Sequence, residues 1–174
     1  MRRCPCLVAG LLVIATYAPA SAQDKAPPSP RLPDGVYAVL RDSLQEKDLH
    51  PLKHGEVLLV HQHRYLAKDA KEPPRFLVVR GATDVELALA GEPKAVKEGK
   101  EVVRILLKLK LQAAAALERL TADRLGRQVT IVLGGEVVTM HKIREVIKGG
   151  EVQITSCAAG AANYLLEKLQ AHYK

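Results

Sequence analysis

Hydrophobic and polar positions alternate most regularly in residues 103–110. Every second position there is apolar and the positions between are mostly basic; the apolar members are Val103, Ile105, Leu107 and Leu109, and the basic members are Arg104, Lys108 and Lys110. Side chains of successive strand residues point to opposite faces, so this pattern predicts a strand with one buried and one exposed face.

Two later segments have apolar residues at helical spacing. In residues 112–124 one side carries Ala113, Ala116, Leu117 and Leu120, and Gly126 follows where a helix commonly ends. The last segment of the chain carries a similar stripe, formed by Ala158, Ala161, Ala162, Leu165, Leu166 and Leu169. Each segment therefore predicts an amphipathic helix whose apolar side packs against a core.

Between these helices the pattern predicts a β-hairpin and a further strand. The strand-like runs QVTIVL and EVVTM flank Gly134-Gly135, and a two-residue hairpin turn needs positive φ at both central positions. Gly149-Gly150 precedes another strand-like run, EVQIT. We therefore expect three short strands in residues 128–155.

The first half of the chain has mainly strand patterns. We expect a first strand at 35–42, a polar connection with a helical turn, a long strand at 56–68 and its hairpin partner at 75–81. Residues 84–90 fit a strand or a helix, and the polar residues 91–100 predict an exposed loop. This order of elements predicts an α+β fold: a mostly antiparallel sheet with two helices packed on one face, and a ferredoxin-like βα arrangement in the C-terminal part.

The N-terminal residues have the pattern of a secretory signal peptide. Arg2 and Arg3 precede the apolar residues 7–17, and three small residues ending at Ala22 follow. The apolar run is shorter than the roughly 20 residues that span a membrane. We therefore expect cleavage after Ala22 and a periplasmic or secreted protein with no membrane span after cleavage.

The chain then divides into three parts: a signal peptide at 1–22, a proline-rich linker at 23–34, and a single α+β domain at 35–174. After cleavage, 24 basic residues (26 less Arg2 and Arg3) stand against 19 acidic ones and are scattered among them. The chain has no basic block and few aromatic side chains, so we expect no nucleic-acid binding. Only Cys157 follows the signal peptide, which leaves no cysteine partner for a disulfide in the cleaved chain.

Residues 102–170 resemble the periplasmic head domain of SecD, a subunit of the protein-export translocase. The segments ALERLTADRLGRQVTIVL and GGEVVTMHKIREVIKGGEVQIT carry the resemblance, because their order matches the family's helix, Leu-Thr, Gly, strand, turn, strand, Gly pair and strand. Gly134-Gly135 stands where the family commonly has Asp-Gly, and a family proline is absent near His141. Residues 35–100 do not share the pattern.

The resemblance implies a head module that contacts polypeptides or other envelope proteins. In SecD the head is attached to membrane helices that couple proton flow to movement, and no such helix follows the signal peptide predicted here. We therefore expect a detached head domain: an exported, noncatalytic binding module for protein translocation that needs no cofactor.

The histidines offer an alternative function. His61 and His63 share a face of the predicted strand 56–68, and His50 or His54 could add a third ligand for a metal such as zinc. The alternative is therefore a metal- or anion-binding envelope protein that uses these four residues, although their spacing matches no typical zinc site. No nucleophile or phosphate-binding pattern is present, so we expect no enzyme and name no catalytic, cofactor-binding or metal residue.

A module that binds extended chains can use the edge of a sheet. A polypeptide that adds there as a strand is held by backbone hydrogen bonds, which make no demand on its sequence. The lysine-bearing strand at 103–110 fits such an edge, and it equally fits a protected edge, where lysines discourage pairing. The sequence leaves both interpretations open.

Overall fold

The computed structural model describes residues 31–62, 73–98, 102–156 and 159–173. In chain order the elements are β1 (Gly35–Ala38), β2 (Arg41–Ser43), the 3-10 helix η1 (Glu46–Leu49), β3 (Glu56–His61), β4 (Arg75–Arg80), β5 (Val85–Glu86), β6 (Lys94–Glu98), β7 (Val102–Lys108), α1 (Leu111–Asp123), β8 (Gln128–Leu133), β9 (Glu136–Lys142), β10 (Glu151–Ser156) and α2 (Ala159–Tyr173). The predicted signal peptide lies outside the described residues. Within them, no helix is long and apolar enough to cross a lipid bilayer.

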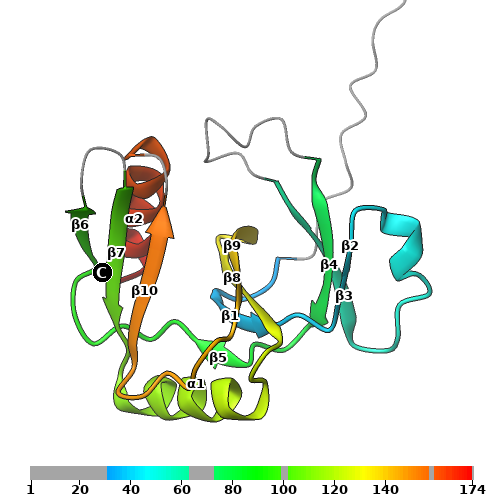
Figure 1. Ribbon diagram of the computed structural model, residues 1–174, viewed down its shortest axis with the longest axis horizontal. Coiled ribbons are helices and arrows are strands. Elements are labelled where there is room, and N and C mark those ends of the chain that lie inside the picture. Colours follow the sequence, from blue (N-terminus) through cyan, green and yellow to red (C-terminus); the bar gives the residue numbers. More distant parts are fainter. Residues whose placement is uncertain (1–30, 63–72, 99–101, 157–158, 174) are drawn as a thin grey trace, which may run out of the picture.

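The strands form three antiparallel sheets. The central sheet has the order β5-β1-β8-β9, the β7 sheet has the order β10-β7-β6, and the β4 sheet has the order β2-β4-β3. Figure 1 shows the central sheet between the other two, with α2 beside the β7 sheet and α1 along one end of the molecule. Two helices and antiparallel strands confirm the predicted α+β class.

The two helices contact different sheets. α2 packs against all three strands of the β7 sheet, whereas α1 lies against β5 of the central sheet. A ferredoxin-like arrangement would put β7, β8, β9 and β10 into one sheet, but here β7 pairs with β10, and β8 pairs with β9 and β1. β7 pairs with β6 instead of with β8 or β9, and β8 has β1, which is distant in the sequence, as its second neighbour. The C-terminal strands therefore divide between two layers.

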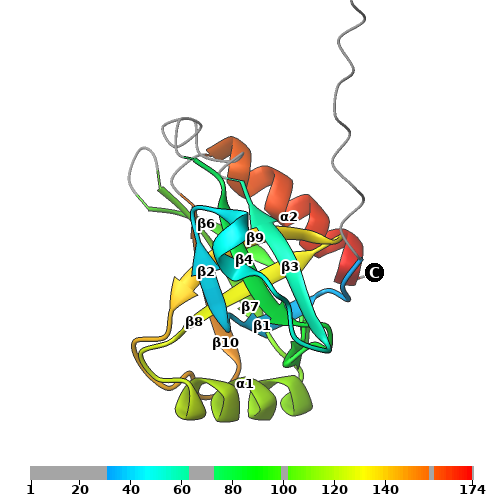
Figure 2. The ribbon, with the colours of Figure 1, turned by 90° about the vertical axis from the view of Figure 1, so that its right-hand side faces the viewer.

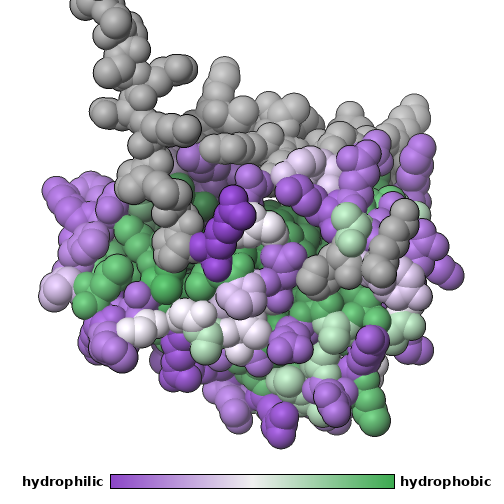
Figure 3. Space-filling model, turned by 180° about the vertical axis from the view of Figure 1, so that it is seen from behind, coloured by the Kyte–Doolittle hydropathy of each residue, from purple (hydrophilic) through white to green (hydrophobic). Residues whose placement is uncertain are grey.

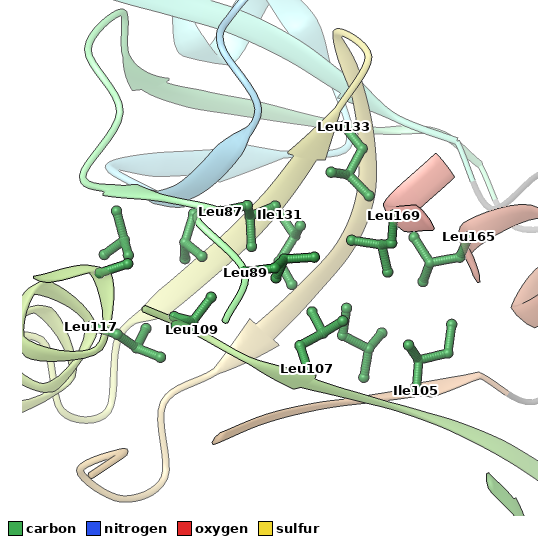
Figure 4. Packing of buried hydrophobic residues seen from close by; sticks show 14 of the residues in the cluster. Leu87, Leu89, Ile105, Leu107, Leu109, Leu117, Ile131, Leu133, Leu165 and Leu169 are labelled. Atoms are coloured by element: carbon green, nitrogen blue, oxygen red, sulfur yellow. The ribbon is translucent and has the colours of Figure 1, made fainter. Parts of the chain in front are cut away.

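The central sheet is buried on both faces. Along β8, Ile131 and Leu133 point into the first core, which lies between the central sheet, the β7 sheet and the two helices (Figure 4). Val132 points the other way, into the second core, which also holds Tyr37 of β1 and residues of β3 and β4. A strand covered on both sides needs apolar residues at consecutive positions, which explains the nearly unbroken apolar run of QVTIVL.

The second core also holds the N-terminal segment in place. The Tyr37 hydroxyl donates a hydrogen bond to the backbone oxygen of Pro33 at 2.5 Å, and burial raises the pKa of this phenol. Leu32 is buried in the same core, and Asp34 Oδ1 accepts a hydrogen bond from the Gly134 N–H at 2.6 Å. The described end of the predicted linker is therefore packed against the fold.

Several predicted elements are confirmed. The hairpin turn has φ of +59° at Gly134 and +80° at Gly135, and α1 is followed by Gly126 with φ of +80°. β3 and β4 pair as the predicted hairpin, and η1 supplies the predicted helical turn. β3 ends at His61, and residues 63–68 of the strand predicted there lie outside the described part of the chain.

Two of the predicted elements are wrong. The strand predicted at 35–42 is divided, because the chain passes from the central sheet to the β4 sheet at Val39 and Leu40. The loop predicted at 91–100 contains β6, which pairs with β7. β6 is a charged strand at the edge of a sheet, so it lacks the apolar alternation from which strands are predicted. Residues 84–90, which fit either element, contain the short strand β5.

Neighbouring residues of β7 test the assignment of its two faces. Ile105 is fully buried, whereas Leu106 is 41% exposed. Ile105→Ala should lower the free energy of unfolding by about 2–5 kcal/mol, because it leaves a cavity in the first core. Leu106→Ala should change it by less than about 1 kcal/mol. Urea unfolding followed by circular dichroism measures both, and equal losses would contradict the assigned faces.

Candidate interaction surface

The outer face of the β7 sheet is open in the part of the chain that the structure describes. The first core and α2 cover the inner face, where Val103, Ile105 and Leu107 are buried. Directly opposite residues of antiparallel strands share a face, so the outer face of β7 continues onto β6 and β10. Its described members are Arg104, Leu106 and Lys108 of β7, Lys94 and Val96 of β6, and Glu151 and Gln153 of β10.

Aliphatic side chains in the middle of this face are exposed. Leu106 is 41% and Val96 is 45% exposed. Lys94 and Gln153 flank Leu106 on the two neighbouring strands, and Arg104 lies opposite Val96. The face thus combines two exposed aliphatic side chains with basic and polar neighbours, a composition that suits contact with another polypeptide.

The hydrogen-bond register shows on which side each β7 residue is bonded. The Leu109 N–H donates to the Gly150 oxygen at 2.9 Å. The backbone groups of the odd-numbered β7 residues therefore form the hydrogen bonds to β10. The even-numbered residues are then bonded on the opposite side, where the Ala90 N–H donates to the Lys108 oxygen at 2.7 Å. The two ladders of the sheet therefore use alternate residues of β7.

This alternation fixes the backbone directions in β6. Lys94 and Val96 lie opposite even-numbered residues of β7, so their N–H and C=O groups point toward β7. Ala95 and Lys97 direct theirs the other way, toward the open edge of the sheet. The edge of β6 therefore presents two outward residues, each with one donor and one acceptor.

The lysine-bearing strand itself is no edge. β7 lies between β10 and β6 and pairs with both, so neither the open-edge nor the protected-edge interpretation of residues 103–110 is correct. The edge lysines belong instead to β6, where Lys94 lies on the outer face and Lys97 on the other. The hydrophobic pattern gave no signal for this edge, because β6 lacks the apolar alternation from which strands are predicted.

The histidines of the alternative function are dispersed. His61 is 8% exposed at the end of β3, whereas His50 and His54 are exposed in the connection before that strand. His50 faces Glu46, with 3.5 Å between Nε2 and Oε1. The described residues contain no group of three or more His, Cys, Asp or Glu side chains that could hold a metal. His63, like Cys157, lies outside those residues.

Two open clefts lie elsewhere on the described surface. One has a volume of about 570 Å³ beside Glu56, and the other about 610 Å³ beside Glu92. Glu56 accepts hydrogen bonds from the Arg41 side chain and the Lys53 N–H, and Glu92 accepts one from Gln170. In each cleft a carboxylate is thus engaged by neighbouring residues.

These features define a small α+β module with an open sheet face and an accessible strand edge. The chain belongs to the family described as SecDF, P1 head subdomain, whose model matches residues 70–171, more than half of its length. The match confirms the resemblance to the SecD head that residues 102–170 carry. It also extends that resemblance toward the N-terminus, so that β4, β5 and β6 are included.

Two solved structures of SecDF are similar to this chain. One is described as "Structure and function of a membrane component SecDF that enhances protein export"; it has 26% sequence identity and a TM-score of 0.42, over 49% of this chain and 38% of that chain. The other is described as "Crystal structure of SecDF in Super-membrane-facing form", with 18% identity and a TM-score of 0.50, over 80% of this chain and 18% of that chain. The second likeness supports the fold. No curated protein matches the chain.

Amide hydrogen exchange tests the assigned edge of β6. The N–H groups of Ala95 and Lys97 should exchange at least about tenfold faster than that of Val96, because only the Val96 N–H is bonded to β7. Native-state exchange followed by NMR resolves the three amides. Equal protection of all three would show that the outer side of β6 is covered, and the edge assignment would fail.

Proposed function

We propose that this chain is a noncatalytic module that binds extended polypeptide segments by strand addition along β6. The observation that carries the proposal is the outward direction of the backbone groups of Ala95 and Lys97. An incoming segment would pair with both residues and become a fourth strand of the β7 sheet. Family membership supports a polypeptide as the ligand, because SecDF is described as a membrane component that enhances protein export.

The outer face of the β7 sheet would contact the side chains of the added strand. Every second side chain of that strand would lie on the same side as Val96, which is 45% exposed, with Leu106 one strand further on. Backbone pairing sets no requirement on sequence, and this apolar contact adds to it. Lys94 and Arg104 add a preference for segments that carry acidic residues.

The proposed absence of catalysis rests on the sequence. It contains no nucleophile, phosphate-binding or metal-ligand pattern of a known type. A binding role through backbone groups needs none of these. For the same reason we propose that the module uses no cofactor.

We propose that the module acts beyond the inner membrane. Residues 1–22 have the pattern of a signal peptide, which supports export to the periplasm or the outside of the cell. After cleavage, the linker at 23–34 would lead into a single domain at 35–174. Its partner would be an exported polypeptide or an envelope protein.

Proline at an outward position of the edge tests strand addition. Ala95→Pro removes an outward N–H and no hydrogen bond to β7, so it should weaken the binding of an extended peptide by about tenfold or more. The probe is a fluorescent peptide of about twelve residues that alternates Val and Thr and carries Glu at both ends. Fluorescence anisotropy measures the affinity, and urea unfolding confirms that the variant is folded.

Ala95→Val is the matched control, because it keeps the N–H and favours a strand. It should bind the peptide at least as well as the native residue does. Undiminished binding by the folded Ala95→Pro variant would overturn strand addition at β6. Absence of binding by the native chain would overturn the polypeptide-binding function itself.

A further inference from the structure

α1 presents an exposed face along one end of the molecule. Its inner side buries Ala113, Ala114 and Leu117. On the other side Leu111 is 86% exposed, the highest value among the large apolar side chains of the described residues, and Leu125, just beyond the helix, is 56% exposed. Figures 1 and 2 show α1 along the lower edge, with the sheets all on one side of it.

The outward side of α1 carries apolar residues at three positions, with polar and charged residues beside and between them; these polar residues are Gln112, Glu118, Arg119 and Asp123. Leu111, Ala115 and Ala122 lie four and eleven residues apart, which places them on one side of a helix, and all three are exposed. Leu125 follows at the end of the helix, about 20 Å from Leu111 at roughly 1.5 Å per residue. From behind, Figure 3 shows green and pale-green apolar atoms among purple ones along this lower edge.

The surroundings of this face are basic. α1 is joined to the loop before β10, since the Ile147 N–H donates to Thr121 Oγ1 at 3.0 Å and the Gly126 N–H donates to the Ile143 oxygen at 2.9 Å. Together, α1, its flanking residues and this loop hold six cationic and three anionic side chains, a net charge of +3; they are Lys110, Arg119, Arg124, Arg127, Arg144 and Lys148, against Glu118, Asp123 and Glu145.

A flat anionic surface fits this face better than a second copy of the chain. Two copies would bring a net charge of +3 against a net charge of +3, and like charges in contact oppose association. The leucines stand about 20 Å apart, so a partner must extend over this distance to meet both. A bilayer with anionic headgroups supplies the opposite charge and accepts leucine side chains at the boundary of its acyl chains.

We propose that the outward face of α1 binds the surface of an anionic lipid bilayer, with the helix axis parallel to that surface. Leu111 and Leu125 enter the headgroup boundary at the two ends of the face. Lys110 and Arg119 contact headgroup phosphates. This contact uses none of the residues of the β6 edge, so it is independent of polypeptide binding.

The chain contains no tryptophan, so one introduced indole reports on one position. The indole of Leu111→Trp should shift its emission to the blue with phosphatidylglycerol vesicles, and brominated acyl chains should quench it. Vesicles of phosphatidylcholine alone should produce neither effect. Adding Lys110→Gln and Arg119→Gln to this variant should lower the apparent lipid affinity about tenfold, and so should a rise in salt concentration.

Leu44→Trp is the matched control, because Leu44 is 55% exposed beside β2, on another part of the molecule. Its emission should not change with either vesicle. No shift of the Leu111→Trp emission with phosphatidylglycerol, or an equal shift with phosphatidylcholine, would overturn the proposal. So would a shift with rising protein concentration alone, which indicates a second copy, or an equal shift with soluble polyglutamate, which indicates an acidic protein partner.

Discussion

β8 lies between β1 and β9 in a sheet that is covered on both faces. Its side chains supply the two cores in alternation, with Ile131 in the first and Val132 in the second. β1 is therefore as necessary for the two cores as β8 is, although it precedes the residues 70–171 that match the SecDF head family. The antiparallel register from Gly35↔Val132 to Ala38↔Val129 joins the matched part of the chain to the part before it. Loss of this pairing would open both cores at once.

Because the central sheet uses its two faces for burial, the surfaces left for other molecules lie at the periphery. The β7 sheet has one covered face and one open face, and α1 has one buried side and one exposed side. In both places a few exposed aliphatic side chains stand among cations. The two surfaces use different residues, so a segment bound at the β6 edge and a contact through α1 would not compete. A module of this kind could hold an extended chain close to a membrane surface.

Strong local patterns predicted most of the elements. The alternation that includes Ile105 and the turn at Gly134-Gly135 depend on neighbours close in sequence, and both appear in the structure as expected. The sheet to which each strand belongs depends instead on distant contacts, such as that between β1 and β8, so the separation into three layers could not be predicted. The candidate surface could likewise be predicted only in part, because its edge depends on pairing between strands. Arg104 and Lys108 were predicted on an exposed face, but the open edge at Ala95 became evident only from the register of β6 on β7.

Addition of an extended polypeptide to the β6 edge can be tested by an NMR study of the chain bound to an isotopically labelled extended peptide. In an antiparallel pair, residues whose N–H groups point away from the partner have their Hα atoms close to it. We therefore predict short Hα–Hα contacts between the peptide and Val96, together with slower amide exchange at Ala95 and Lys97 in the complex. Contacts to β3, β9 or α2, with the exchange of Ala95 and Lys97 unchanged, would contradict it.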